Sequence, residues 1–151
     1  MADPILTGVI TNKGRETFAK AFGRVGTGVE SYAFKFKFGE GGYIQTPTSR
    51  VPKDPQDGIT LLDVEAASTP GLFYITKNFV VTDLIFIAPS TMQCRCRLIQ
   101  TEGNDNGFGD PPRFFELGIF DQLDNLMAYA TFAEQTKTAS KILTNFVQVV
   151  F

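Results

Sequence analysis

Residues 34–42 read FKFKFGEGG and carry the clearest structural signal in the chain. Phe34, Phe36 and Phe38 alternate with two lysines, so one face of the segment is apolar and the other is charged. This period of two is typical of a β-strand with one buried side and one side facing water. The glycines of residues 39–42 end the strand in a tight turn, because glycine tolerates backbone angles that other residues avoid. The stretch predicts a β-rich fold.

Upstream of this strand the sequence predicts one short helix. Thr11 or Asn12 can cap its first turn, and Gly23 can end it in a left-handed conformation. Phe18 and Phe22 are four residues apart and therefore share one helical face. A helix of about three turns is not stable alone. We therefore expect these two rings to dock the helix on a sheet.

Downstream of the strand, residues 43–71 form a proline-rich segment. It contains four prolines, and its apolar residues cluster only at 59–64. A connection of this length in a small domain is either a functional arm or hides short elements. We expect an extended loop with a short strand near residues 59–64.

The second half of the chain predicts strand after strand. Segments 79–88 and 142–151 are apolar on both faces, as in strands inside a sandwich or at a subunit contact. The predicted fold is α+β and β-rich: one domain over residues 1–151, with a short N-terminal helix packed on an antiparallel sandwich-like sheet with long loops. The expected strands of this half are 72–76, 79–88, 92–100, 114–120, 126–132 and 142–151.

Composition argues against several functional classes. The 151 residues include no His, the commonest acid–base catalyst and metal ligand. Fourteen Lys and Arg against sixteen Asp and Glu give a net charge of −2, which argues against nucleic acid or an anionic membrane as partner. We find no signal-peptide pattern and no apolar run of about 20 residues. The sequence predicts a non-enzyme with no catalytic residue, cofactor or metal site.

Three local motifs have both a functional and a structural interpretation. Cys94 and Cys96 share one strand face, but a zinc site needs further ligands, so we expect reduced, buried thiols. Residues 104–107 read NDNG and lack the spacing of a calcium loop, which favours a solvated turn. Residues 39–42 lack the Lys-Ser/Thr pair of a phosphate-binding loop. None of the three predicts a ligand.

Basic residues line two of the expected strands. Lys35 and Lys37 lie on one, and Arg95 and Arg97 on the other. Such faces can contact a phosphate backbone, but acidic residues are interleaved along the chain. We expect these four side chains to be solvated or to face another subunit.

The last strand ends on an aromatic residue, whereas chain termini usually extend into water. If the sheet is an outer layer, the domain's own core can cover one face of this strand. We therefore expect Phe146, Val149 and Phe151 to lie in an interface with another subunit or to be capped by another element.

Several short motifs occur in a fixed order that resembles the phage tail-collar fibre family. Glu40 stands where that family usually has Asp. Members commonly continue into a fibre shaft where this chain stops, so the resemblance favours attachment over receptor binding by a distal tip. The motifs are ITNKGRE at 10–16, FKFGEGG at 36–42, ELGIFD at 116–121, LMAYA at 126–130 and the closing segment 137–151.

The resemblance implies a structural virion component of a phage tail or phage-tail-like particle, in the baseplate or tail-fibre attachment region. Such a protein would be assembled in the host cytoplasm and would act by contacts with other tail or baseplate proteins. It would be a homo-oligomer or present in many copies. The alternative is a host-receptor or carbohydrate-binding module of a tail fibre, whose ring platforms would be Tyr32, Tyr43, Tyr74 and Tyr129.

Overall fold

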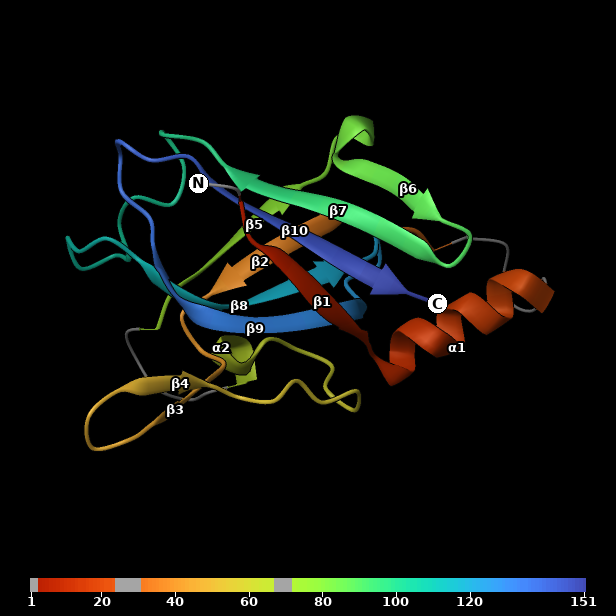
Figure 1. Cartoon of the computed structure of the whole chain (residues 1–151), viewed down its shortest axis with the longest axis horizontal. Helices are drawn as coiled ribbons and strands as arrows, with labels where there is room; N and C mark the ends of the chain where they lie inside the picture. Colours follow the sequence, from red (N-terminus) through yellow and green to blue (C-terminus); the bar gives the residue numbers. More distant parts are fainter. Residues whose placement is uncertain (1–2, 24–30, 67–71) are drawn as a thin grey trace.

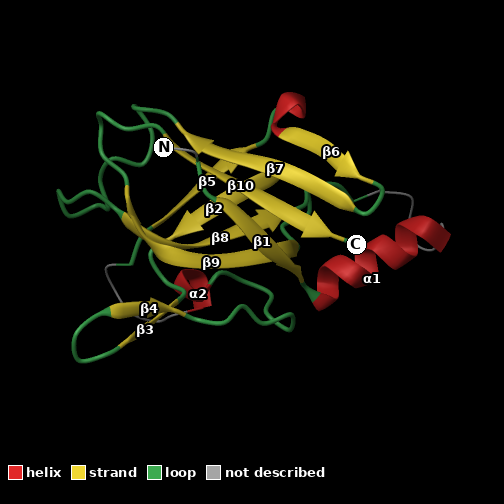
Figure 2. Cartoon of the chain, in the orientation of Figure 1, coloured by secondary structure: helices red, strands yellow, loops and turns green. Residues whose placement is uncertain are grey.

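The computed structural model describes residues 3–23, 31–66 and 72–151. It is mostly β-structure, as the alternating segments predict (Figures 1 and 2). The helical elements are α1 (Asn12–Gly23), α2 (Asp63–Ala66) and the 3-10 turn η1 (Val81–Asp83). The strands are β1 (Ile5–Ile10), β2 (Lys35–Gly39), β3 (Tyr43–Gln45), β4 (Arg50–Pro52), β5 (Tyr74–Asn78), β6 (Leu84–Ala88), β7 (Thr91–Leu98), β8 (Arg113–Phe120), β9 (Leu126–Thr136) and β10 (Leu143–Val150).

Eight strands form one curled sheet in the order β5-β2-β8-β9-β1-β10-β7-β6. Strand β1 joins its two halves: Ile5 to Gly8 pair with β10, and Val9 and Ile10 pair with β9. The two halves lie over one another in Figure 1, as in a sandwich. The β1–β10 pair is parallel and the other pairs in this sheet are antiparallel, so the sheet is mixed and not purely antiparallel as predicted.

Strand β1 is absent from the sequence-based prediction. Its sequence contains Gly8, a residue that weakens strands. The structure explains this glycine, because a β-carbon there would lie 2.8 Å from Cγ1 of Val147. Gly8 therefore allows β1 to lie close to β10.

The main core lies between the two halves of the sheet. Phe36 and Phe38 of β2 enter it, as their alternation predicts, and Cys94 and Cys96 of β7 face them from the other half. The rings of Phe38 and Phe114 are 5.3 Å apart, within the range of favourable aromatic pairs. Burial of this apolar surface is the main force that holds the halves together.

A second, smaller core lies on the outer face of β8 and β9. Leu62 and Val64, beside and within α2, pack there against Phe120. The proline-rich segment thus covers the sheet, and its β3–β4 hairpin extends away from it (Figure 1). The strand expected near 59–64 is wrong, since residues 63–66 form α2. Part of the predicted arm, residues 67–71, lies outside the described residues.

Helix α1 begins and ends where the sequence predicts, but it does not dock through its phenylalanines. Phe22 is 93% exposed and Phe18 is 52% exposed. Gly14 is the buried residue of the helix, and a β-carbon there would lie 2.4 Å from the carbonyl oxygen of Met127. The helix therefore contacts β9 at its first turn, and Phe18 and Phe22, which follow Gly14 on the same face one and two turns later, are left exposed. Among the described residues no helix is long and apolar enough to cross a membrane.

Candidate functional site

The carboxylate of Glu116 on β8 is one of the fully buried polar groups among the described residues. Its side chain is fully buried. Its oxygens accept hydrogen bonds from the backbone N–H groups of Val64 at 3.0 Å and Asp63 at 3.1 Å, and from the hydroxyl of Tyr129 at 2.7 Å. Glu116 thus joins β8, β9 and the start of α2. We call Glu116, Tyr129, Asp63 and Val64 the Glu116 centre.

The glycines of residues 39–42 make room for this centre. A β-carbon at Gly39 would lie 2.6 Å from Oε1 of Glu116, and one at Gly42 would lie 2.8 Å from Oε2. Gly42 also has a φ of 82°, so the expected positive angle in this turn is confirmed. The N–H of Gly42 donates to Oδ2 of Asp63 at 3.0 Å. The glycine turn is therefore shaped around a carboxylate of the chain itself.

Burial raises the pKa of Glu116 to about 7, and the nearby Asp63 carboxylate adds to the rise. The N–H groups of Val64 and Asp63 and the hydroxyl of Tyr129 act in the opposite direction, because they stabilise the charge. A raised pKa is common in catalytic carboxyls. Here the side chain is closed off from solvent, so its geometry supports a structural role.

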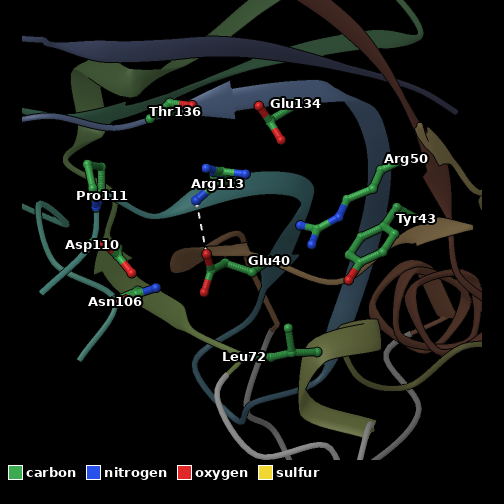
Figure 3. Close-up of a pocket in the computed structure, with 10 residues that line it drawn as sticks. All are labelled: Glu40, Tyr43, Arg50, Leu72, Asn106, Asp110, Pro111, Arg113, Glu134 and Thr136. Atoms are coloured by element: carbon green, nitrogen blue, oxygen red, sulfur yellow. Dashed lines mark hydrogen bonds between the residues drawn. The ribbon is translucent and has the colours of Figure 1, made fainter. Parts of the chain in front are cut away.

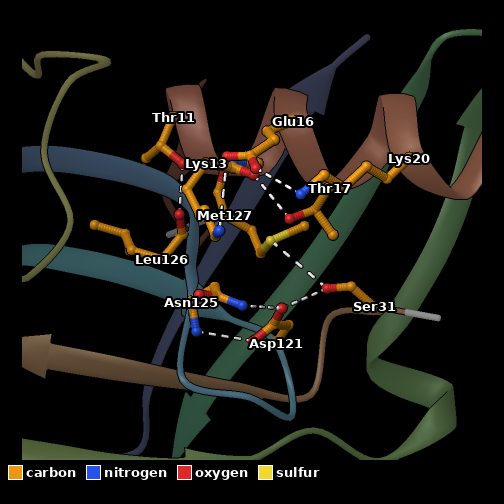
Figure 4. A network of polar contacts seen from close by, with 11 residues as sticks. Thr11, Lys13, Glu16, Thr17, Lys20, Ser31, Asp121, Asn125, Leu126 and Met127 are labelled. Carbon is orange, nitrogen blue, oxygen red and sulfur yellow. Dashed lines mark hydrogen bonds and ion pairs between the residues drawn. The ribbon is translucent and has the colours of Figure 1, made fainter. Parts of the chain in front are cut away.

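A second polar network anchors α1 to the β8–β9 turn (Figure 4). The Thr11 hydroxyl accepts from the N–H of Gly14 at 3.0 Å, which confirms the predicted N-cap, and it donates to the carbonyl of Leu126 at 2.5 Å. In the turn, Asp121 accepts from the hydroxyl of Ser31 at 2.5 Å and from the side chain of Asn125 at 2.9 Å. Thr11 and Asp121 therefore stabilise the scaffold, one at the start of α1 and the other in the β8–β9 turn.

The two cysteines lie in the main core as free thiols. Burial raises the pKa of Cys94 to about 12 and that of Cys96 in the same direction. Both thiols therefore stay protonated near neutral pH and are poor nucleophiles and poor metal ligands. No cluster of three or more His, Cys, Asp or Glu side chains able to hold a metal occurs in the part of the chain that the structure describes.

The NDNG segment is a turn stabilised by its own side chains. Oδ1 of Asp105 accepts from the N–H groups of Gly107 at 2.7 Å and Gly109 at 3.1 Å. Oδ1 of Asn106 accepts from the N–H of Phe108 at 3.0 Å. The side-chain oxygens thus satisfy backbone donors, as in the solvated turn that the sequence predicts.

Three of the four basic strand residues are paired with acidic side chains. Lys35 pairs with Asp124, Lys37 with Glu65 at 2.9 Å, and Arg95 with Asp83 at 2.8 Å. Lys37 is buried, contrary to the predicted solvent-facing side, because α2 brings Glu65 over it. Arg97 donates to the hydroxyl of Thr144 at 3.3 Å. These cations do not form a free basic surface.

The three residues predicted for an interface lie in different surroundings. Val149 is 6% exposed and belongs to the main core, so its side chain offers no surface to a partner. Phe146 is half-buried and pairs in register with Ile5 and Arg95. Phe151 is 51% exposed, and its ring lies 4.5 Å from the ring of Phe18. Helix α1 thus caps part of Phe151.

Among the described residues, exposed apolar side chains gather in two places that are candidates for protein contact. The terminal patch joins the helix to the C-terminus and consists of Phe18, Phe22, Val150 and Phe151. The exposed apolar residues on both faces of β6 and just before it are called the edge patch: Val80, Val81, Ile85, Phe86 and Ile87. Sequence reasoning placed Phe18 and Phe22 against the sheet and so missed the helical part of the terminal patch, although it expected Phe151 at an interface or capped. It interpreted segment 79–88 as a strand that is apolar on both faces, inside a sandwich or at a subunit contact, and the structure leaves much of this segment exposed.

A polar cavity of about 540 Å³ opens between the β3–β4 hairpin, the loop after β7 and the end of β9 (Figure 3). Arg50 lies over the ring of Tyr43 at 4.8 Å, beside Arg113 and Glu134 in the lining. Glu40 uses its carboxylate to accept from the backbone N–H groups of Phe73 at 2.9 Å and Arg113 at 3.0 Å. The remaining charged groups can hydrogen-bond a polar ligand.

No protein-family model, no curated protein and no solved structure matches this chain.

Proposed function

We propose that this chain is a structural component of a phage tail or phage-tail-like particle, in the baseplate or tail-fibre attachment region. It acts by contacts with other tail or baseplate proteins and is present in several copies. It carries out no catalysis, because its functional features are a buried scaffold and exposed apolar patches.

The observation that carries the proposal is that the motifs behind the resemblance meet in space. The FKFGEGG turn surrounds Glu116, the first residue of ELGIFD, and Glu116 accepts from Tyr129 of LMAYA. Thr11 of ITNKGRE bonds to Leu126 at the start of LMAYA. When motifs far apart in the sequence define a common fold, we expect them to pack together in the structure. This supports the use of the family as a guide to function.

The terminal patch supports action through protein contacts. Phe22 is nearly fully exposed, and a buried phenylalanine stabilises by about 1.5–3 kcal/mol relative to an exposed one. Several exposed apolar side chains at one end of a chain are typical of a surface that another protein covers.

The proposal is tested by measuring how much of this chain is incorporated into purified particles. Particles purified from cells that produce them should contain this chain in multiple copies, and Phe22→Ser should lower its amount in the particle several-fold while the chain stays folded. Phe108→Ser is the matched control, because Phe108 is also an exposed phenylalanine. It belongs to the loop between β7 and β8, at the opposite end of the molecule from α1 (Figure 1). Particles that never contain this chain would contradict the proposal.

The polar cavity favours a second candidate, the receptor- or carbohydrate-binding module. Tyr43 supplies a ring, and Arg50, Arg113 and Glu134 supply charged hydrogen-bonding groups. This candidate predicts that a glycan binds the purified chain and that Tyr43→Ala abolishes this binding, whereas Tyr32→Ala, on another exposed tyrosine, does not.

A further inference from the structure

Strand β6 forms one outer edge of the eight-stranded sheet. Within the described part of the chain it pairs with β7 alone, so its other side presents a row of backbone N–H and C=O groups. In Figure 1 it lies at the outside of its half of the sheet. Such a row is a template for a further strand.

This chain does not cover all of the side chains that β6 points toward the core face. Leu84 and Phe86 point to the same face because side chains alternate along a strand. Leu84 packs against the main core, yet Phe86 is 68% exposed. The apolar layer therefore extends past the last strand, where an added strand would cover Phe86.

Strand β6 also lacks the charges that protect most exposed edges. Its sequence, LIFIA, contains no charged residue and no proline. The opposite edge strand, β5, reads YITKN and contains a lysine. Asp83, just before β6, is buried and paired with Arg95. A bulge at Phe86–Ala88 interrupts the register with β7, which leaves the first half of β6 as its regular part.

We propose that β6 is a self-association edge, at which a second copy of this chain pairs antiparallel across a two-fold axis centred on Ile85. This rests on the proposed function and names one of its contacts. Ile85 lies opposite its own counterpart, and Leu84 lies opposite Phe86 of the other copy. Each copy then covers the exposed Phe86 of the other.

The neutrality of the edge selects a second copy as the occupant. In a two-fold interface every residue near the axis meets its own kind, so a charge there would meet a like charge. Like charges directly opposite on paired strands are destabilising. The charge-free β6 avoids this repulsion, and the apolar edge patch is complementary to itself.

The test is the mass of the purified full chain by sedimentation over a range of concentrations. We expect twice the chain mass of 16.6 kDa for the natural sequence. Ile85→Lys should halve that mass, with an unchanged circular dichroism spectrum, because two lysines would meet at the axis. Ile142→Lys, at another exposed isoleucine just before β10, is the matched control and should stay dimeric. A natural chain that is monomeric throughout, or an Ile85→Lys chain that stays dimeric, overturns the proposal.

A charge-pair experiment tests the register and the occupant. Ile85→Lys and Ile85→Glu chains should each be monomeric alone and should form a mixed dimer together, because opposite charges then meet at the axis. Failure of the mixture to associate overturns pairing at Ile85. A monomeric chain that still enters particles contradicts only the self-association, and points to a different protein on β6. A dimer that never enters particles contradicts only the tail function.

Discussion

The hydroxyl of Tyr129 donates to Oε2 of Glu116 across 2.7 Å in a buried site. This bond joins β9 to β8, and Glu116 in turn holds the start of α2 through the N–H groups of Asp63 and Val64. One carboxylate therefore connects the sheet to the proline-rich segment that covers it. We therefore expect this centre to stabilise the packing of that segment on the sheet.

Tyr129→Phe should destabilise the protein by about 1–3 kcal/mol, because a buried hydrogen bond to an acidic group is lost while the ring still fills its space. Urea unfolding followed by circular dichroism measures the change. Tyr32→Phe is the control and should change stability by less than about 0.5 kcal/mol, since Tyr32 is exposed. Equal effects of the two substitutions would contradict the assigned role of Tyr129.

The stability of the protein should fall as pH rises through the pKa of Glu116. In the unfolded chain this group titrates near 4.5 and in the folded chain near 7, so the folded state holds the proton more tightly. The free energy of unfolding contributed by Glu116 is therefore highest below about pH 4.5 and is lost by about pH 7, a difference on the order of 3 kcal/mol. Glu116→Gln removes this titration. The natural chain and the variant should differ in the slope of stability against pH between about pH 5 and about pH 7.

Much of the sheet follows from local sequence. The expected strand at 114–120 corresponds to β8 within one residue of its start, and 142–151 contains β10. The alternation of apolar and polar residues, together with the turn residues, predicts these strands, because the period of two comes from the strand's own backbone. The helix at α1 was predictable for the same reason, from its cap and its terminal glycine.

The rest depends on contacts between distant residues. Lys37 alternates like a solvent-facing residue, and only the return of the chain at α2 buries it against Glu65. Glu116 gives no sign in sequence that it accepts the N–H groups of Asp63 and Val64, some fifty residues earlier. The exposure of the α1 phenylalanines arises because the helix docks only at its first turn, through Gly14, and periodicity does not show how much of a helix a sheet covers.

Gly42→Ala should destabilise the protein by more than Gly107→Ala. Both glycines have positive φ, 82° and 90°, so each substitution carries a backbone penalty of about 1–2 kcal/mol. A β-carbon at Gly107 meets nothing within 4 Å, whereas one at Gly42 lies 2.8 Å from Cβ of Glu116. The difference between the two melting temperatures isolates the contact from the backbone term. Equal losses would mean that the turn can move away from Glu116.

Cys94 and Cys96 should resist alkylation in the folded protein. Both are buried with raised pKa values, so little thiolate is present and reagents do not reach it. Mass spectrometry after iodoacetamide treatment should show no addition to the native chain and two additions in denaturant. Rapid labelling of the native chain, or stoichiometric zinc in the purified protein, would contradict a structural role.

Two truncations of the C-terminus should distinguish an effect on folding from an effect on assembly. Removal of residues 145–151 should unfold the chain, because it removes most of β10, which lies between β1 and β7 and carries Val147 and Val149 into the core.

Removal of Phe151 alone should leave the circular dichroism spectrum unchanged. That residue follows the last strand and is half exposed, with its ring against Phe18 and its N–H donating to the carbonyl of Ser90 at 2.7 Å. Under the proposed tail function, the chain without Phe151 should therefore be folded but enter particles at a several-fold lower level, because the terminal patch loses a ring. Full incorporation of this shortened chain would exclude Phe151 from the interface, and the contact would then rest on Phe22.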